Sequence, residues 1–440
     1  MDLPRIAANQ QRTFLALWAE VRPHLASDSA LPRRIKDLLG RNRAFGSRDR
    51  RLYRELLYTG IRFLPWIDPL METRPEDAAA VVAWLAPSVR ETEAYRGFLT
   101  AGWPVRPETL TERSAVLRGR LSSNGPQPAG APGQALSAAG LAPAPQVSLA
   151  ASPLPFDPEA LLPAWFREHC PQAYSPPHLD ALNERARLWM RLQCRETSVV
   201  LDEFLARGWA VRLDPGLPEA VSLPPNAEVA ATDSYRRGFV EIQDLGSQLV
   251  LRHAPDLAGQ SWLDACAGAG GKTLQIARLV GERGRVDAAD IRSGALDELR
   301  DRLGRARLGN VHIVASPAGG YDGVLVDAPC SGSGTWRRLP HMKWYTRPRM
   351  IAEFAADQLR ILAENSARVR AGGLLVYATC SLSHHENHDV AAAFLGLHPE
   401  FAPEPPARDW GAVPDGLGHT LFPGTRDSDG FYVALLRRRA

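Results

Sequence analysis

Several features that a chain of 440 residues could contain are missing from this sequence. No apolar run reaches the roughly 18 residues that a membrane-spanning helix needs. The opening stretch, MDLPRIAANQQRTFLALWAEV, lacks the apolar core and cleavage pattern of a secretory signal. The cysteines are odd in number and include no C-x-x-C pair: Cys170, Cys194, Cys266, Cys330 and Cys380. We therefore expect no membrane span, no disulfide framework and no metal site, and a location in the reducing cytoplasm.

Lysine is scarce as well. Of the 52 basic residues only Lys36, Lys272 and Lys343 are lysines, so the chain uses arginine for almost every positive charge. An ammonium is compact, whereas a guanidinium is planar and wide. A retained lysine therefore indicates a place where the smaller cation is needed, and Lys272 lies in a glycine-rich loop.

The net charge of +3 says less than its distribution. Residues 33–62 hold ten basic side chains against three acidic ones, a local net charge of +7. Phe45, Tyr53 and Tyr58 are interspersed among these arginines, a pattern typical of phosphate and nucleic-acid binding. A solvated helix face is the alternative interpretation of such a run.

The sequence pattern changes along the chain and predicts four parts. Residues 1–121 are helical, because RTFLALWAEV, DRRLYRELLYTGIRFLPWI and PEDAAAVVAWLA repeat apolar residues at helical spacing. Residues 122–153 consist mainly of Ala, Pro, Gly and Ser without any charge, which predicts a linker. Residues 154–236 mix short helices with strand-like runs and predict a small α+β module. Residues 237–440 form the fourth part.

The fourth part alternates strands with helices, which predicts an α/β doubly wound, mostly parallel sheet. The predicted strands are 261–265, 284–290, 311–316, 322–328 and 373–379. The predicted helices between and after them are 272–280, 294–305, 349–371 and 385–395. The run GFYVALLRR at 430–438 predicts an added edge strand. In such sheets ligands bind at the carboxyl ends of the strands.

The loop DACAGAGGKT at 264–273 ends in Gly-Lys-Thr, as a phosphate-binding loop does. That loop needs a glycine five positions before its Gly-Lys pair, and Cys266 occupies this position. The dinucleotide pattern G-x-G-x-x-G fails at Thr273. The turn suits close approach of a nucleoside-type cofactor to the backbone. An ATP hydrolase with Asp327 as its acid remains a weaker alternative.

Three further strand ends carry chemistry-bearing residues. Asp290 closes the second predicted strand, where an acid commonly accepts from ribose hydroxyls. Asp327 and Cys330 follow the fourth strand in DAPCSGSGTWRR, and Cys380 follows the fifth in YATCSLSHHEN. Singly, a cysteine here is more often a small buried side chain. Together, the two cysteines and Asp327 are expected to converge on one crevice.

These stretches resemble the signatures of the Nop/Sun family of RNA cytosine-5 methyltransferases. EIQDLGSQ at 241–248 and DGFYVALLRR at 429–438 extend the resemblance. The stretch AFGSRDRRLYRELLYTGIR at 44–62 is similar to the NusB-like domain of the family's bacterial ribosomal RNA members. The resemblance implies an all-α NusB-like RNA-binding front, a small α+β RNA-recognition module and a Rossmann-like class I methyltransferase domain.

The resemblance also implies S-adenosylmethionine as cofactor and a covalent mechanism. Cys380 would attack C6 of the cytosine and Cys330 would assist release after methylation, because C5 alone is a poor nucleophile. Asp327 would hydrogen-bond the base, and Lys272 would supply positive charge near the base or the thiolate. The cofactor would be held by Asp290, Asp327 and the loop residues Cys266, Ala267, Gly268, Ala269, Gly270, Gly271 and Lys272.

The implied substrate is RNA with its target base unstacked, since the base must reach both thiol and methyl donor. Arg337 and Arg338 are expected to grip phosphates locally, and Trp336 either stacks on RNA or packs in the core. Small-subunit ribosomal RNA is favoured. A transfer-RNA methyltransferase and a catalytically silent assembly factor stay as alternatives, and a monomer is assumed. The sequence departs from the family at Gly268-Ala269, where Ala-Pro is usual, and at Ser316, where an Asp near the adenine is usual.

Overall fold

The computed structural model describes residues 3–121 and 156–440, so the predicted linker lies outside the described residues. The chain forms two compact units. Residues 1–22 and 32–161 belong to the first, and residues 23–31 and 162–440 belong to the second. Within the described ranges, no helix combines the length and the apolar character needed to cross a membrane.

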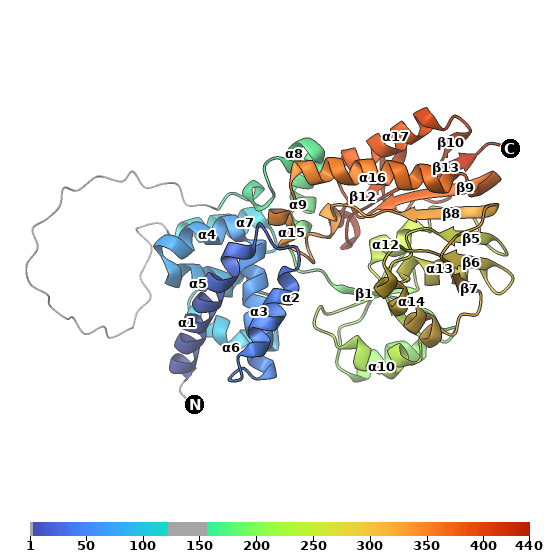
Figure 1. Cartoon of the computed structure of the whole chain (residues 1–440). Coiled ribbons are helices and arrows are strands. Elements are labelled where there is room, and N and C mark those ends of the chain that lie inside the picture. Colours follow the sequence, from blue (N-terminus) through green and yellow to red (C-terminus); the bar gives the residue numbers. More distant parts are fainter. Residues whose placement is uncertain (1–2, 122–155) are drawn as a thin grey trace, which may run out of the picture. The chain divides into compact units, whose positions relative to one another are not determined.

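Residues 3–121 are helical, as their spacing predicts (Figure 1). The helices are α1 Leu3–Val21, α2 Leu31–Arg41, α3 Ser47–Arg62, α4 Leu64–Thr73, α5 Pro75–Leu85, α6 Arg90–Leu99 and α7 Leu110–Leu121. Helix α3 can approach α1 closely because residue 60 is glycine: a Cβ on Gly60 would lie 2.5 Å from the Trp18 ring. Tyr53 is buried on the inner face of α3, whereas most of the arginines of 33–62 are exposed.

The second unit begins with short helices and a small antiparallel sheet. Its strand order is β2-β3-β1-β4. The elements are α8 Phe166–His169, α9 Pro176–Leu182, β1 Leu188–Leu192, α10 Ser198–Ala206, β2 Arg212–Leu213, β3 Ala220–Leu223, α11 Asp233–Arg236 and β4 Val240–Ile242. Met190, Val221 and Val240 point from three of these strands into one apolar cluster with Phe204 of α10.

The large sheet has the order β11-β12-β13-β9-β8-β5-β6-β7, and β10 pairs with β13. Strands β5 Ser261–Asp264, β6 Arg285–Ala288, β7 Val311–Ile313, β8 Tyr321–Asp327 and β9 Val369–Thr379 are parallel. Strands β10 Phe401–Glu404, β11 Val413–Asp415, β12 Gly418–Leu421 and β13 Phe431–Arg438 extend it in antiparallel fashion. The five strands expected to be parallel are therefore confirmed.

One strand prediction is wrong. The run at 430–438 was expected at the edge of the sheet, but β13 lies inside it, paired with β9 on one side and with β12 and β10 on the other. Its side chains from Phe431 to Leu436 are all buried. An unbroken apolar run is the pattern of a strand covered on both faces, and this signal outweighs the terminal position in the sequence.

Helices cover both faces of the large sheet (Figure 1). Trp262, Leu325 and Val376 face α12 Leu245–Val250 and α13 Gly271–Val280, and α14 Ser293–Ala306 packs beside α13. The neighbouring residues Leu263, Val326 and Tyr377 face α16 Pro348–Ser366 and α17 His388–Leu397. The chain leaves β5 toward β6 on one side and returns to β8 on the other, so the carboxyl ends of β5 and β8 flank the switch point at which such sheets bind ligands.

Candidate active site

A pocket of about 650 Å³ opens at the carboxyl ends of β5, β6, β8 and β9. All but one of the site residues expected from the sequence line it: Cys266, Ala267, Gly268, Ala269, Gly271, Lys272, Asp290, Asp327, Cys330 and Cys380. The convergence of the strand-end residues on one crevice is therefore a property of the fold.

The two cysteines face each other, with their Sγ atoms 3.2 Å apart. Both are free thiols. The hydrogen bond to Cys380 and burial raise the pKa of the Cys330 thiol well above its ordinary value. The Cys330 thiol therefore stays protonated beside the Cys380 sulfur.

A buried carboxylate holds the two cysteine loops together. Glu386 accepts from the Ser331 amide at 2.8 Å and from the hydroxyls of Ser331 at 2.5 Å and Ser381 at 2.6 Å. Gln358 of α16 donates to the same carboxylate at 3.1 Å. Burial raises the pKa of Glu386, and these hydrogen bonds oppose the rise. Since Ser331 and Ser381 directly follow Cys330 and Cys380, Glu386 fixes the spacing of the two thiols.

Lys272 and Asp327 form a largely buried ion pair in the same pocket. The Lys272 Nζ lies 2.8 Å from the Asp327 Oδ2 and 4.8 Å from the centroid of the Phe431 ring. Only 8% of the Lys272 side chain is exposed, against 29% for Asp327. An ammonium fits this narrow place between a carboxylate and a ring, as the rarity of lysine in the sequence suggested.

The glycine-rich loop bends sharply before α13. Gly268 and Gly270 have φ angles of 53° and 90°, which side-chain-bearing residues rarely adopt. Gly270 is the one predicted loop residue that does not line the pocket. A Cβ on Gly270 would lie 2.2 Å from the Cδ1 of Leu299, so its role is to let the loop pack on α14.

The pocket contains an unsatisfied acid that tests its fit to the expected cofactor. Asp264 accepts from the Thr273 hydroxyl at 2.7 Å through one oxygen, while its Oδ1 is buried without a hydrogen-bond partner. Burial raises the pKa of Asp264 to about 7. An orphaned carboxylate oxygen at the end of the pocket favours a ligand that brings a donor or a cation. The ammonium group of S-adenosylmethionine has this property.

The acid at the end of β6 accepts hydrogen bonds from the glycine-rich loop and from Arg292. Asp290 accepts from the Gly268 amide at 2.8 Å and from the backbone and guanidinium of Arg292. Burial alone would raise the pKa of Asp290, but the hydrogen bonds from Arg292 and Gly268 outweigh it and lower the pKa. The next residue, Ile291, lines the pocket with its side chain fully exposed. Ser316, in contrast, does not line this pocket.

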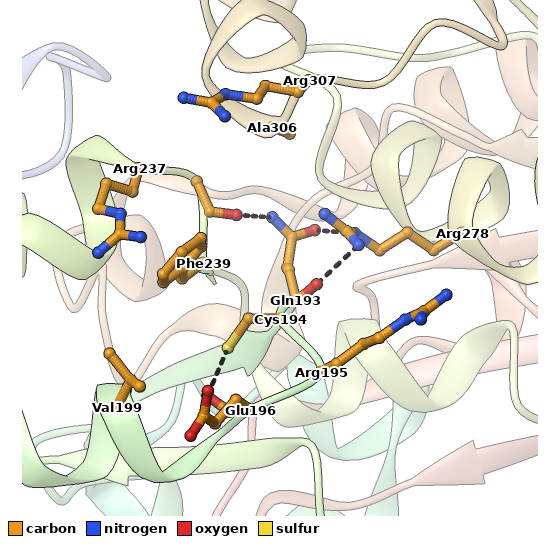
Figure 2. Close-up of a pocket in the computed structure, with 11 residues that line it drawn as sticks. Gln193, Cys194, Arg195, Glu196, Val199, Arg237, Phe239, Arg278, Ala306 and Arg307 are labelled. Carbon is orange, nitrogen blue, oxygen red and sulfur yellow. Dashed lines mark hydrogen bonds between the residues drawn. The ribbon is translucent and has the colours of Figure 1, made fainter.

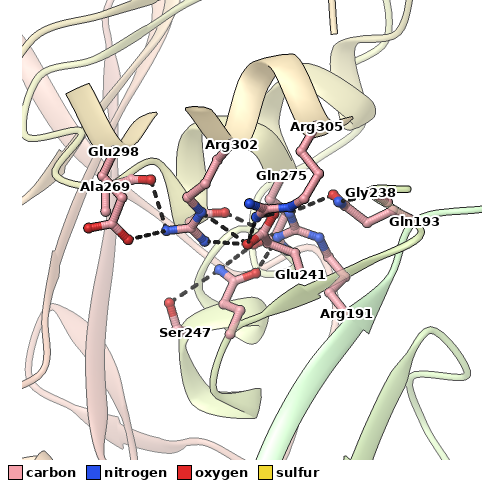
Figure 3. Close-up of polar contacts among 12 residues, drawn as sticks. Arg191, Gln193, Gly238, Glu241, Ser247, Ala269, Gln275, Glu298, Arg302 and Arg305 are labelled. Atoms are coloured by element: carbon pink, nitrogen blue, oxygen red, sulfur yellow. Dashed lines mark hydrogen bonds and ion pairs between the residues drawn. The ribbon is translucent and has the colours of Figure 1, made fainter. Parts of the chain in front are cut away.

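The small sheet braces the cofactor loop through a polar network (Figure 3). Arg302 of α14 pairs with Glu241 of β4 at 2.9 Å and donates to the Ala269 carbonyl at 2.8 Å. The buried Arg191 of β1 donates to the Gly271 carbonyl at 3.2 Å and to Gln243. Through Glu241 and Gln243, the motif EIQDLGSQ thus connects the small sheet to the glycine-rich loop. The predicted boundary at residue 237 separates β4 from β1, although the two strands pair.

Near Cys330, the expected phosphate contacts of Arg337 and Arg338 are wrong, and of the two alternatives for Trp336 core packing is confirmed. Trp336 is fully buried against Phe166, so it packs in the core and does not stack on RNA. The Arg337 side chain is buried and pairs with Asp427 at 2.5 Å. Arg338 pairs with Asp244 and, at 2.7 Å, with Asp429. Both arginines brace this loop. Their proximity in sequence to the cysteine motif could not reveal these acids, which lie far along the chain.

Some pocket residues had no assigned role in the sequence. Ser247, Thr335 and Phe431 line the pocket, and Glu386 lies behind the thiols. Ser247, Phe431 and Glu386 fall inside stretches that the sequence comparison had already singled out. The sequence therefore showed that these residues belong to motifs, but it did not show which of their side chains face the pocket.

The sheet order, the loop after its first central strand and the acid after the second are those of a Rossmann-like domain that binds a nucleoside-type cofactor. The profile of the 16S rRNA methyltransferase RsmB/F family matches residues 253–437. Two proteins named ribosomal RNA small subunit methyltransferase B are similar. That of Klebsiella pneumoniae (strain 342) is 35% identical over 63% of this chain and 66% of its own length. That of Salmonella newport is 34% identical over 64% of this chain and 68% of its own length.

The chain therefore belongs to the RsmB/F family of rRNA methyltransferases, and it spans about two thirds of the length of these relatives. NSun6 from Pyrococcus horikoshii shares the fold over 63% of this chain and 97% of its own, with a TM-score of 0.56 at 17% identity. A methyltransferase homologue from the same organism shares the fold over 60% of this chain and 90% of its own, with a TM-score of 0.51 at 24% identity. Family membership confirms S-adenosylmethionine as the expected cofactor and excludes the ATP-hydrolase alternative.

Proposed function

We propose that this protein transfers a methyl group from S-adenosylmethionine to C5 of a cytosine in RNA, and that the RNA is small-subunit ribosomal RNA. The observation that carries the proposal is the pair of thiols 3.2 Å apart in one pocket with the Lys272–Asp327 ion pair. Adding a sulfur nucleophile to C6 is the chemistry that a C5 transfer needs, because C5 of cytosine does not attack unaided.

In the proposed reaction, the Cys380 thiolate forms a bond from Sγ to C6, and the displaced electron pair makes C5 nucleophilic. The bound cofactor supplies an electrophilic methyl group on a sulfonium. Once C5 carries the methyl group, the C5 proton passes to water, the electron pair of that C–H bond re-forms the double bond between C5 and C6, and Cys380 leaves as a thiolate. Both cysteines remain beside the reacting carbons during these steps, because the Glu386 network fixes their loops.

Cys330 is assigned to the second half of the reaction. With its pKa raised, it holds a proton next to the sulfur of Cys380. A group that keeps and exchanges a proton at this distance can assist the departure of Cys380 from C6. Losing Cys330 therefore impairs release and leaves the first bond formation intact.

Asp327 and Lys272 are assigned to the base. Asp327, the more exposed of the two, would hydrogen-bond the ring near N3. Lys272 holds that carboxylate in place and contributes positive charge where electron density builds up on the ring. The pairing fixes both side chains before the base enters, so little reorganisation is needed during reaction.

The cofactor is assigned to the other half of the pocket. Asp264 would accept from its ammonium group and Asp290 from its ribose hydroxyls, while the backbone of 266–272 bends around it. Ile291 supplies an apolar surface for the adenine ring, with Ile361 and Asn365 of α16 across the pocket. These residues are assigned the adenine contact because position 316 is a serine, where the family usually has an Asp.

The helical first unit and the small sheet are assigned to RNA binding, the first unit as a NusB-like domain. The exposed arginines of α2 and α3 support this assignment. The fold of the first unit alone does not establish it.

The test is methylation of transcribed small-subunit ribosomal RNA by the purified protein with labelled S-adenosylmethionine. We expect one labelled cytosine, located by bisulfite sequencing and absent from RNA of a deletion strain. Label on another base, or on transfer RNA alone, would overturn the substrate assignment. Absence of any transfer, with the cofactor still bound, would favour the catalytically silent alternative.

A further inference from the structure

A second hollow, of about 410 Å³, lies between the small sheet and the helices α13 and α14 (Figure 2). Four arginines from separate segments line it: Arg195 after β1, Arg237 after α11, Arg278 of α13 and Arg307 after α14. All four side chains are exposed. Arg237 lies over the ring of Phe239 at 4.3 Å, which leaves its hydrogen-bond donors free to face a ligand.

These arginines lack acidic partners, in contrast to most arginines nearby. Arg278 donates to the carbonyl of Gln193 at 2.7 Å and to its side chain, which are uncharged acceptors. Among the described residues, no carboxylate lies within ion-pair distance of any of the four. Glu196 is the one acid in the lining, and Figure 2 shows it at the end of the hollow away from Arg307. Positive charge is therefore left uncompensated.

The hollow continues into a neighbouring one of about 690 Å³. The two share Arg195, Arg278, Ala306 and Arg307, and the second adds Arg285, Asn310 and His312. It borders the amino ends of β6 and β7, at the edge of the sheet opposite the catalytic pocket. We call the two hollows together the arginine groove. Arg285 pairs with Asp287, so four unpaired arginines remain against the acids Glu196 and Glu282 and leave a net charge of +2.

We propose that the arginine groove, which lies at the edge of the sheet opposite the catalytic pocket, binds the phosphate backbone of the substrate RNA; this rests on the proposed function. Several guanidinium groups spread along an elongated hollow suit a chain of phosphates better than one small anion. The planar Arg237 on Phe239 adds a surface on which a base can stack. An acidic protein segment is the competing partner, and the groove offers it little apolar area to bury.

The position of the groove predicts which nucleotides it contacts. Helix α13 has ten residues and runs from the cofactor loop to Arg278 near its end. At about 1.5 Å per residue this is about 15 Å. An RNA strand must therefore extend beyond the target cytosine by about this distance to occupy both sites, and a short RNA bound in the pocket would not reach the groove.

The test compares the variant Arg195→Gln/Arg307→Gln with the wild-type protein. Binding of a fluorescent single-stranded RNA of about 16 nucleotides is measured between about 50 and 200 mM salt. We expect affinity to fall about tenfold at the low-salt end. The slope of log affinity against log salt should shrink by about 1.4, or about 0.7 for each lost phosphate contact. An RNA of about 4 nucleotides should bind both proteins equally.

Two matched variants control for charge and folding. Arg300→Gln/Arg349→Gln removes two exposed arginines, from α14 and α16, that have acidic partners, and it should leave the slope unchanged. Arg195→Lys/Arg307→Lys keeps the charge and should restore most of the affinity. Equal salt slopes in the groove variant and the Arg300→Gln/Arg349→Gln variant would overturn the proposal. Because this readout does not involve methyl transfer, it fails or succeeds independently of the proposed reaction.

Cys194 provides a direct footprint, since it lines the groove and is a partly exposed free thiol. Alkylation of Cys194, followed by peptide mass spectrometry, should slow several-fold when the longer RNA is bound. Inorganic phosphate at the same phosphate concentration should not protect it. Equal protection by phosphate would show a site for a single anion, and absence of protection by RNA would contradict RNA binding in the groove.

Discussion

The catalytic pocket and the arginine groove differ in whether their charged side chains form ion pairs. In the pocket, Lys272 pairs with Asp327 and Asp290 pairs with Arg292. In the groove, Arg195, Arg237, Arg278 and Arg307 are exposed and have no ion-pair partner among the described residues. Paired charges hold geometry and are expensive to disturb, whereas unpaired surface charges attract a partner and change affinity gradually. Substitutions in the pocket should therefore change rates, and substitutions in the groove should change binding.

The largest effect is expected for the nucleophile. Cys380→Ala should lower the rate of methyl transfer by on the order of 10⁴-fold or more, because no other group can form the bond to C6. Binding of S-adenosylmethionine should stay within about twofold, since the sulfur faces Cys330 and the assigned cofactor contacts come from 264–272 and 290. Filter assay of transfer and calorimetry of cofactor binding give the two numbers. Methyl transfer that persists in Cys380→Ala would contradict the assignment of Cys380 as the residue that bonds to C6.

A smaller effect is expected for the carboxylate behind the thiols. Glu386→Gln replaces one acceptor oxygen with a donor that faces the hydroxyls of Ser331 and Ser381. Losing part of a buried network costs about 1–3 kcal/mol, which corresponds to a kcat about 10- to 100-fold lower if the loss falls on thiol positioning. KM for the cofactor should not change.

The control for that variant is Glu353→Gln on the exposed face of α16, which should behave as wild type. A parallel rise in KM for the cofactor, or an unchanged kcat with a lower thermal midpoint, would assign Glu386 to stability alone.

The third prediction concerns pH and the cofactor half of the pocket. The pKa of Asp264 is raised to about 7 in the fold, above its ordinary value of 3.8. The fold therefore favours the protonated acid, and the ligand-free protein should lose stability as pH rises from about 4 to 7. Binding of a cationic ammonium favours the ionised acid. Affinity for S-adenosylmethionine should rise with pH up to about 7 and then level off.

Asp264→Asn should remove this pH dependence and weaken cofactor binding by about tenfold. Calorimetry at several pH values, in buffers of different ionisation enthalpy, measures both affinity and proton release. A pH dependence that persists in Asp264→Asn would place the titrating group elsewhere.

The sequence predicts the part of this molecule that depends on local pattern. The parallel strands were visible because each is a short apolar run between turn residues, and the meeting of Asp327, Cys330 and Cys380 followed from their strand-end positions. Helix α16 was expected to reach residue 371, but it ends at Ser366 because β9 begins at Val369. Boundaries of this kind depend on tertiary pairing.

What could not be predicted depends on partners distant in the chain. The acids that pair with Arg337 and Arg338 lie about 90 residues away, so two arginines beside the active-site motif were mistaken for phosphate ligands. The arginine groove shows the reverse. Arg195, Arg237, Arg278 and Arg307 are far apart in sequence and gather only when the small sheet packs on α13 and α14.

The most direct test of the assigned roles is the fate of the RNA after one turnover by Cys330→Ala. Denaturing electrophoresis with labelled RNA should show a protein–RNA band that accumulates with S-adenosylmethionine present, because release is impaired while Cys380 still attacks. The double variant Cys330→Ala/Cys380→Ala should give no such band. Normal turnover by Cys330→Ala without a stable adduct would contradict the division of labour between the two thiols.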